Sequence, residues 1–304
     1  MPLKYHYYTC DVFTNSRFGG NPLAVLPKAS GLTDAQMQKI AREFNFSETT
    51  FVFPSDRGFS KRVRIFTPTR EVPFAGHPNI GTAFVLGTIG ELGDTSKASV
   101  VTFDEGSGPV QITLRLDAKT NSSELRAPQS VSFGQVIPTK MIASALTLSD
   151  EDVESASHRP QVVSAGLPFI LTELRDRSAL ERCRISVKGF SDILSELKGG
   201  GGRASVYLYV RTGDEEDIRA RMFAPLSGVP EDPATGSATC AVVGLLAQLE
   251  KRADGMFTYR LTQGVEMGRR SSLTARAEKS RGVVTGTWVG GSCVMVSEGH
   301  IEVD

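Results

Sequence analysis

The chain has 304 residues, of which 40% are hydrophobic, and its 34 basic residues balance its 34 acidic residues at a formal net charge of +0. This balance and the lack of a basic run argue against a nucleic-acid-binding protein, and no segment reaches the roughly 20 apolar residues that a membrane-spanning helix needs. The length suits two domains of about 150 residues each.

The first half of the chain is predicted to contain strands and two helices. Aromatic and β-branched residues predict a strand at 5–13. A helix is expected over 33–44, because Met37, Ile40 and Ala41 fall on one face. The other expected elements are strands at 23–26, 46–53 and 61–66, a buried helix at 78–89 and a strand meander over 98–127. Together they predict an antiparallel sheet wrapped around one helix.

The second half is predicted to repeat this plan. Residues 129–137 are expected to cross from one half to the other, and the glycine run at 199–202 is interpreted as a plain loop without the following helix of a phosphate-binding loop. The other expected elements are short helices at 138–147 and 189–198, a buried helix at 233–249, and strands at 205–211, 218–223, 257–262, 272–278, 282–289 and 293–303. The expected domains are therefore 1–128 and 129–304, with the last strands as candidates to return to the first domain.

Cysteine and histidine patterns give no indication of a metal or disulfide framework. The four cysteines, at positions 10, 183, 240 and 293, have no CxxC spacing, and the four histidines form no HxxxH or HExxH pattern. The beginning of the chain leads into a strand-like run and not into an apolar leader. We therefore expect a cytoplasmic protein without a metal site.

The stretch from Asp232 to Leu249 has the most distinctive pattern in the chain. Asp followed by Pro is typical of a helix start, and no charged residue occurs from Ala234 to Leu249, which predicts a buried helix. A helix N-terminus inside the protein favours a bound anion, and Gly236 and Ser237 in its first turn leave room for one. The alternative is a well-capped core helix that binds nothing.

A second copy of this stretch occurs in the first half. Phe66-Thr67-Pro68 precedes Val72-Pro73 and His77-Pro78, as Phe223-Ala224-Pro225 precedes Val229-Pro230 and Asp232-Pro233. The offset is 157 residues between Phe66 and Phe223, and 155 between His77 and Asp232. A repeat of half the chain length indicates a duplicated domain. It places His77 opposite Asp232, and Gly81 and Thr82 opposite Gly236 and Ser237.

These motifs, in this order, resemble the PhzF-like family of phenazine-biosynthesis isomerases, which has the two-domain fold of diaminopimelate epimerase. The resemblance covers nearly the whole chain. The matching segments are Asp11-Val12-Phe13, Gly20-Asn21-Pro22-Leu23-Ala24-Val25, Ser47-Glu48-Thr49-Thr50-Phe51, Pro73-Phe74-Ala75-Gly76-His77-Pro78, Asp232-Pro233-Ala234-Thr235-Gly236-Ser237-Ala238, Gln263-Gly264 and Met267-Gly268-Arg269.

The resemblance implies an α+β fold of two pseudo-symmetric domains, each a barrel-like, mostly antiparallel sheet around a central helix. It implies a cofactor-independent isomerase whose site lies between the halves, with Glu48 as the proton shuttle and His77 and Asp232 beside it. The expected substrate-binding residues are Asn21, Gly76, Gly81, Thr82, Gly236 and Ser237. The expected partners are a small anionic metabolite and a second copy of the chain in a homodimer, with no nucleic acid and no membrane.

The residues themselves suit this chemistry. Glu48 is flanked by Phe46, Phe51 and Phe53, and burial of a carboxylate among apolar groups raises its pKa toward the range of a general acid and base. Epimerases of this fold use one cysteine from each half, and this chain offers Cys240 without a counterpart. Two readings stay open: an isomerase of a small carboxylate-bearing metabolite, and an inactive family member that binds small molecules or acts as a scaffold.

Overall fold

The computed structural model describes residues 3–117, 121–198 and 204–304. The glycine run at 199–202, interpreted above as a loop, lies outside the described residues. The chain separates into two compact units, one of Met1–Arg126 with Gly290–Asp304 and one of Ala127–Val289. We call these unit 1 and unit 2.

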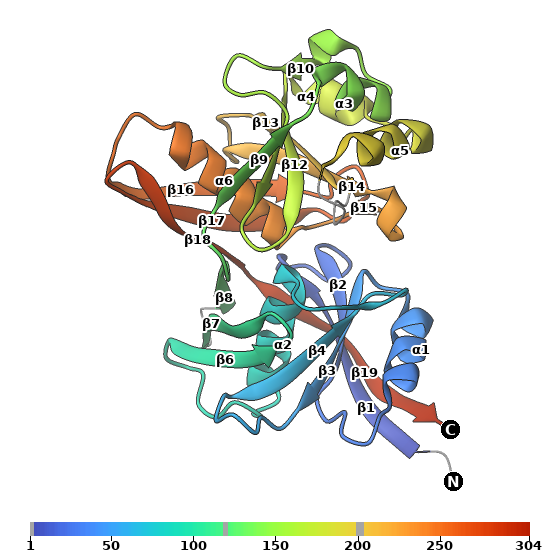
Figure 1. The fold of residues 1–304 in the computed structure, drawn as a ribbon. Coiled ribbons are helices and arrows are strands. Elements are labelled where there is room, and N and C mark those ends of the chain that lie inside the picture. Colours follow the sequence, from blue (N-terminus) through green and yellow to red (C-terminus); the bar gives the residue numbers. More distant parts are fainter. Residues whose placement is uncertain (1–2, 118–120, 199–203) are drawn as a thin grey trace. The chain divides into compact units, whose positions relative to one another are not determined.

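Unit 1 is a sheet around a central helix, with a second helix outside it (Figure 1). The central helix, α2, contacts strands β1, β2, β3, β7 and β8. The elements of unit 1 are β1 Leu3–Val12, β2 Asn21–Leu26, α1 Asp34–Phe44, β3 Glu48–Phe53, β4 Lys61–Phe66, β5 Glu71–Val72, α2 Gly76–Thr88, β6 Ser99–Glu105, β7 Gly108–Leu116, β8 Asn121–Arg126 and β19 Cys293–Val303. The last of these, β19, pairs antiparallel with β1 along its whole length.

Unit 2 has the same plan around the helix α6, which contacts β11, β12, β16 and β17. Three further helices, α3, α4 and α5, pack with β12, β13 and β14 in one apolar cluster. The elements of unit 2 are β9 Ser132–Val136, α3 Thr139–Ala145, η1 Asp150–Asp152, β10 Val153–Glu154, β11 Gln161–Ser164, β12 Pro168–Leu174, α4 Arg177–Arg182, α5 Val187–Glu196, β13 Val206–Arg211, β14 Ile218–Ala224, η2 Pro225–Ser227, β15 Val229–Asp232, α6 Gly236–Leu249, β16 Gly255–Gln263, β17 Ser271–Ser280 and β18 Val283–Gly291.

The two central helices are buried because their sequences are apolar on every side. Every residue of α2 from Gly76 to Leu86 is buried, and so is every residue of α6 from Gly236 to Ala247. Helix α1 is different, since it shows the core only Met37, Ile40 and Ala41 and begins with a capping box at Thr33. The predicted α+β fold, with a central helix in each half, is thus confirmed.

Strand pairing shows that the halves are copies. In unit 1, β2 pairs parallel with β3, β3 antiparallel with β4, and β4 parallel with β6. In unit 2 the same three relations join β12 to β13, β13 to β14, and β14 to β16. Each copy adds a short antiparallel strand before its helix, β5 in unit 1 and β15 in unit 2.

The register of these strands corrects the alignment inferred from the sequence. Phe66 pairs with Glu71, and Phe223 pairs with Glu231, so the offset grows from 157 to 160 residues between these positions and does not fall to 155. A bulge at Pro230 of β15 and the turn η2 hold the three extra residues. His77 therefore corresponds to Ser237, because each is the second residue of its helix.

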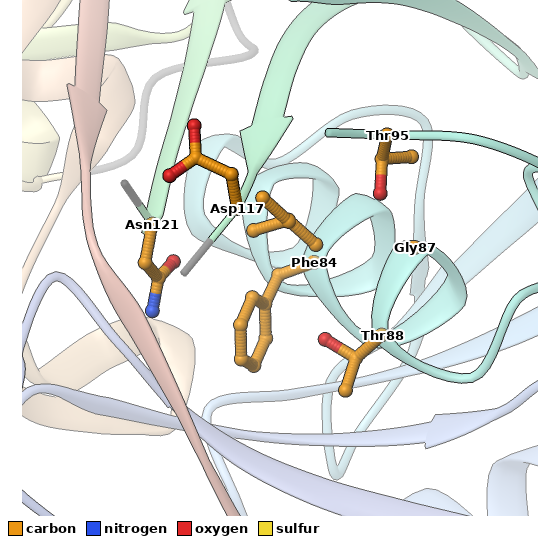
Figure 2. A pocket seen from close by; sticks show the side chains of 7 residues that line it. Phe84, Gly87, Thr88, Thr95, Asp117 and Asn121 are labelled. Atoms are coloured by element: carbon orange, nitrogen blue, oxygen red, sulfur yellow. The ribbon is translucent and has the colours of Figure 1, made fainter. Parts of the chain in front are cut away.

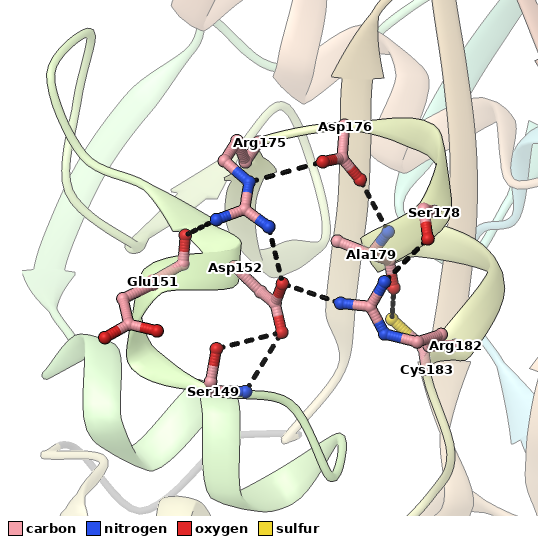
Figure 3. A network of polar contacts seen from close by, with 9 residues as sticks. All are labelled: Ser149, Glu151, Asp152, Arg175, Asp176, Ser178, Ala179, Arg182 and Cys183. Atoms are coloured by element: carbon pink, nitrogen blue, oxygen red, sulfur yellow. Dashed lines mark hydrogen bonds and ion pairs between the residues drawn. The ribbon is translucent and has the colours of Figure 1, made fainter.

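Charged residues tie the outer elements of unit 2 together (Figure 3). The Asp152 carboxylate accepts hydrogen bonds from the backbone N–H of Ser149 at 3.1 Å and from the Arg182 guanidinium at 2.7 Å. Arg175 adds a further bond at 3.3 Å. This network joins η1 to α4 and to the end of β12, so we assign it a structural role.

Candidate active site

Three predicted site residues come together inside unit 1. Glu48 is the first residue of β3 and pairs with Leu23 of β2. Asn21 is the first residue of β2, and His77 is the second residue of α2. Because β2 and β3 are neighbours and α2 packs against both, these side chains meet at the N-terminal end of the helix.

His77 is the centre of this group. Its Nδ1 lies 3.2 Å from Nδ2 of Asn21, and its Nε2 lies 3.6 Å from Oε2 of Glu48. The imidazole side chain is 5% exposed and the Glu48 side chain 18%. The 3.6 Å separation is longer than a hydrogen bond, so Nε2 and the Glu48 carboxylate face each other without being joined.

Burial sets the charge of His77. It lowers the pKa of the imidazole from 6.5 to about 3, and a hydrogen bond with the backbone of Pro22 only partly opposes this shift. The ring is therefore neutral at physiological pH, and its contact with Glu48 is not an ion pair. A base with so low a pKa removes a C–H proton poorly near neutral pH. The geometry thus favours Glu48 as the proton-transfer group.

The start of α2 leaves backbone donors at this place. The helix begins at Gly76, two residues earlier than predicted, after Ala75, which makes no side-chain cap. Pro78 fits the first turn because the N–H that it lacks has no acceptor there in any helix. The N–H groups of Gly76 and His77, in the first turn, have no acceptor within the helix.

Gly81 and Thr82, predicted to bind substrate, lie one turn further along α2. A side chain at Gly81 would come within 2.6 Å of Leu23 and 2.7 Å of Val12, so glycine allows the helix to approach β1 and β2 closely. The Thr82 hydroxyl is hydrogen-bonded to Thr50 at 2.8 Å, deep in the core. The corrected register explains why Gly81 and Thr82 do not lie at the helix start: the unit 1 counterparts of Gly236 and Ser237 are Gly76 and His77.

Asp232 belongs to unit 2 and is buried at the end of β15. Its expected role as the N-cap of a helix from 233 is wrong: α6 begins at Gly236, and Thr235 occupies the cap position without a side-chain cap. Asp232 is the last residue of β15 and pairs with Met222 of β14, so its backbone belongs to the strand and not to the helix. Its carboxylate instead accepts a hydrogen bond from the Thr235 hydroxyl at 2.5 Å.

A glutamine that the sequence reasoning did not assign holds this segment in place. Gln263 Nε2 donates to the Asp232 carbonyl at 2.7 Å and to the Thr235 hydroxyl at 3.0 Å, while its Oε1 accepts from the Thr235 N–H at 3.2 Å. Next to it, Gly264 has a φ of +75°, and a Cβ there would lie 2.6 Å from the Pro233 carbonyl oxygen. The Gln263-Gly264 motif thus supports the start of α6.

Unit 1 also contains a cavity that none of the predicted site residues lines. It has a volume of about 390 Å³ and is formed around the C-terminal half of α2 and the ends of β7 and β8 (Figure 2). Its lining residues are Phe84, Gly87, Thr88, Thr95, Leu116, Asp117 and Asn121. None of the predicted site residues is among them, so we do not assign it to the chemistry of Glu48 and His77.

The described residues show neither a metal-binding cluster nor a membrane-spanning helix. No group of three or more His, Cys, Asp or Glu side chains in the described part of the chain is arranged to hold a metal ion. Across residues 3–117, 121–198 and 204–304, no helix is both long and apolar enough to cross a membrane.

Known proteins resemble this chain over nearly its full length. The model of the family described as phenazine biosynthesis-like protein matches residues 10–299. The trans-2,3-dihydro-3-hydroxyanthranilate isomerase of Pseudomonas chlororaphis is 35% identical, over 98% of this chain and 99% of that protein. A phenazine biosynthesis protein of the PhzF family from Bacillus anthracis has a structure that matches with a TM-score of 0.88 at 25% identity, covering 98% of this chain and 99% of that one.

A more distant structure shows the same fold. The hydroxyproline epimerase of Agrobacterium vitis matches with a TM-score of 0.68 at 14% identity, covering 100% of this chain and 94% of the epimerase. The likeness extends to the fold only.

Proposed function

Since the chain is an isomerase of the phenazine biosynthesis-like family, we propose that it moves a proton on a small carboxylate-bearing metabolite by general acid–base catalysis, without a cofactor. The observation that carries the proposal is the pair at the start of α2, where a partly exposed Glu48 faces a buried, neutral His77 across 3.6 Å. A carboxylate in that position has room to accept a proton and to return it.

Glu48 takes the role of base and then acid. It removes a proton from one carbon of the substrate, the electron pair of that C–H bond shifts a double bond along the skeleton, and Glu48 returns the proton to another carbon. No atom is gained or lost, and no redox partner enters the balance. His77 contributes as a neutral hydrogen-bonding group, oriented by Asn21.

Backbone donors bind the anionic part of the substrate. In unit 1 these are the N–H groups of Gly76 and His77, and in unit 2 those of Gly236 and Ser237, each at the positive end of a buried helix. In unit 2 we also propose a catalytic role for Asp232, the buried acid just before the α6 turn. Such donors stabilise charge that develops when a C–H proton leaves.

The test uses the substrate named for the Pseudomonas chlororaphis relative. Purified protein is incubated with trans-2,3-dihydro-3-hydroxyanthranilate in D₂O, and the carbon-bound protons are followed by ¹H NMR. We expect loss of a proton signal at one carbon and deuterium at another, faster than in a blank without protein. Binding of the compound, seen by calorimetry, without any exchange would support the alternative of a binding protein.

We also propose that the chain forms a homodimer. Multi-angle light scattering at micromolar concentration should then give a mass near twice the 32.8 kDa of one chain. A mass close to one chain under these conditions would contradict the dimer, and it would leave the proposed chemistry of unit 1 unaffected.

A further inference from the structure

A buried acid, Glu105, lies near the start of α2 and has no role in the proposed proton transfer. It is the last residue of β6 and is 8% exposed. Its polar neighbour is the Asn79 side chain, and neither of its carboxylate oxygens has a hydrogen bond of good geometry within the described residues. The preceding residue, Asp104, pairs with Arg57 at 2.9 Å. A charged carboxylate without a partner is costly in such a place.

Strand register makes Glu105 the counterpart of Gln263. Arg62 of β4 pairs with Asp104, and the equivalent Arg219 of β14 pairs with Thr262. The next residue is Glu105 in unit 1 and Gln263 in unit 2. A second observation agrees with this equivalence, because the segment after each residue contacts the proline before the central helix.

In each unit a serine donates a hydrogen bond to the carbonyl of this proline. The Ser107 N–H donates to the Pro73 carbonyl at 3.1 Å in unit 1. The Ser271 hydroxyl donates to the Pro233 carbonyl at 2.8 Å in unit 2. The segment that leads into the central helix is therefore supported by the turn after β6 in unit 1 and by the first residue of β17 in unit 2.

Gln263 shows what such a residue does when it is neutral. Its amide both donates to and accepts from the segment 232–235. A protonated carboxylic acid has the same shape and also offers one donor and one acceptor. An ionised carboxylate has no donor to offer. The Asn79 Oδ1 atom, which has no partner in the described part of unit 1, is an acceptor that a protonated Glu105 would satisfy.

We propose that Glu105 is a positioning residue that acts in its uncharged form, as Gln263 does in unit 2, and that it holds the first turn of α2 through Asn79 so that His77 stays directed at Glu48. Asn79 donates to the Ala75 carbonyl at 3.0 Å and thereby closes the start of the helix. Asn79 follows His77 by two residues, about 200° around the helix. The turn is thus held on both sides, by Glu105 through Asn79 and by Asn21 through His77.

Burial acts in the direction that the proposal needs, since it raises the pKa of Glu105 well above its ordinary value of 4.5. The hydrogen bond with Asn79 opposes this shift and is the smaller influence. In the unfolded chain Glu105 loses its proton above pH 4.5, whereas the folded chain keeps it. The unfolded state then binds fewer protons, so the stability of the native protein falls as the pH rises above 4.5.

The test compares Glu105→Gln with Glu105→Ala, and uses Glu43→Gln, at an exposed glutamate of α1, as the matched control. Thermal unfolding is measured from pH 5 to pH 8. Glu105→Gln should be as stable as the parent at pH 5 and several degrees more stable at pH 8, whereas Glu43→Gln should show no such trend. The reciprocal Gln263→Glu should lose several degrees over the same range. A Glu105→Gln variant less stable than the parent at every pH would overturn the proposal.

The second readout concerns His77 and, through it, the proposed function. The ¹⁵N signals of its imidazole, assigned with a His77→Gln variant, should be unchanged in Glu105→Gln and shifted in Glu105→Ala. Proton exchange should stay within about threefold of the parent in Glu105→Gln and fall at least tenfold in Glu105→Ala at equal folded fraction. If Glu105→Gln lost as much as Glu105→Ala, the carboxylic acid itself would be needed and positioning would be wrong. If the parent shows no exchange, the proposed function fails, and the unfolding and NMR results still decide the role of Glu105.

Discussion

Units 1 and 2 share a frame down to single ion pairs. Arg64 of β4 makes a bidentate pair with Glu71 at 2.7 and 2.6 Å. Arg221 of β14 makes the same pair with Glu231 at 2.8 and 3.0 Å. In both units the arginine also lies over the phenylalanine two residues later, at 5.1 Å in unit 1 and 4.8 Å in unit 2. These contacts fix the short strand before each central helix.

The units differ where the chemistry is expected. The strand pairs identify the equivalent positions of the two units. At some of them only one unit has a polar residue, and at others the two units have different polar residues. The pairs are Asn21 and Leu167, Glu48 and Ser205, His77 and Ser237, and Val72 and Asp232. Unit 1 therefore holds the groups to which we assign proton transfer, and unit 2 has a buried acid, Asp232, at a position where unit 1 has Val72. The duplicated fold has two buried helix N-termini, and the residues around them differ at a few positions.

The largest effect is expected from Glu48, the residue that most clearly separates the units. Glu48→Gln keeps the shape of the side chain but cannot take up the proton, so proton exchange should fall by roughly 10²–10⁴-fold. Binding of the compound should persist in calorimetry. The matched control is Ser205→Ala at the equivalent position of unit 2, which should keep exchange within a few-fold of the parent. Full activity in Glu48→Gln would move the proton transfer to another group.

The shared ion pairs should differ in strength because they differ in burial. The Arg221 side chain is 6% exposed and also donates to the Leu180 carbonyl at 2.8 Å, whereas Arg64 is 17% exposed and its partner Glu71 is 42% exposed. Arg221→Met removes a buried guanidinium, leaves the partly buried Glu231 carboxylate without this partner, and should cost about 3–5 kcal/mol in the free energy of unfolding. Arg64→Met should cost about 1 kcal/mol. Urea unfolding of both variants gives the comparison, and equal losses would contradict it.

The titration of His77 gives a medium-sized effect that unit 2 lacks, because its counterpart is Ser237. The folded pKa is lowered from 6.5 to about 3, so between these values the unfolded chain binds a proton that the folded chain does not. Stability is therefore lost as the pH falls below 6.5, by about 2–3 kcal/mol at pH 4.5. His77→Ser, which copies the unit 2 residue, should remove this part of the pH dependence. The free energy of unfolding of both proteins is measured with urea at several pH values. The same pH dependence in parent and variant would disprove a buried neutral imidazole.

Local patterns were sufficient for much of the fold. The spacing of Met37, Ile40 and Ala41 predicted α1 and its buried face, and the uncharged runs predicted α2 and α6 as buried helices. A short helix, α4 from Arg177 to Arg182, was missed, since six residues are too few to show a helical period. Its stability depends on packing in the apolar cluster of unit 2 and not on its own sequence.

The repeat was recognised from the sequence, but its register was not. Matching proline with proline aligned His77 with Asp232, whereas backbone pairing aligns Glu71 with Glu231 and Gly76 with Gly236. The turn η2 and the bulge in β15 take up three extra residues without a strong sequence signal. The equivalence of Gln263 and Glu105 was also out of reach, because it depends on strand pairs that join residues more than 40 positions apart, such as Arg219 with Thr262 and Arg62 with Asp104.

The smallest effect concerns the bond that Asp232 makes and that Val72, its unit 1 counterpart, cannot make. The Asp232 carboxylate accepts from the Thr235 hydroxyl inside the protein, and a buried hydrogen bond of this kind contributes about 1 kcal/mol. Asp232→Leu and Thr235→Val should each lower the free energy of unfolding by about that amount. The double variant should lose little more than either single one, because both remove the same bond. Thr235→Ser keeps the hydroxyl and serves as the control. Additive losses in the double variant would mean that the two residues act separately, in which case the segment before α6 would be held by Gln263 alone.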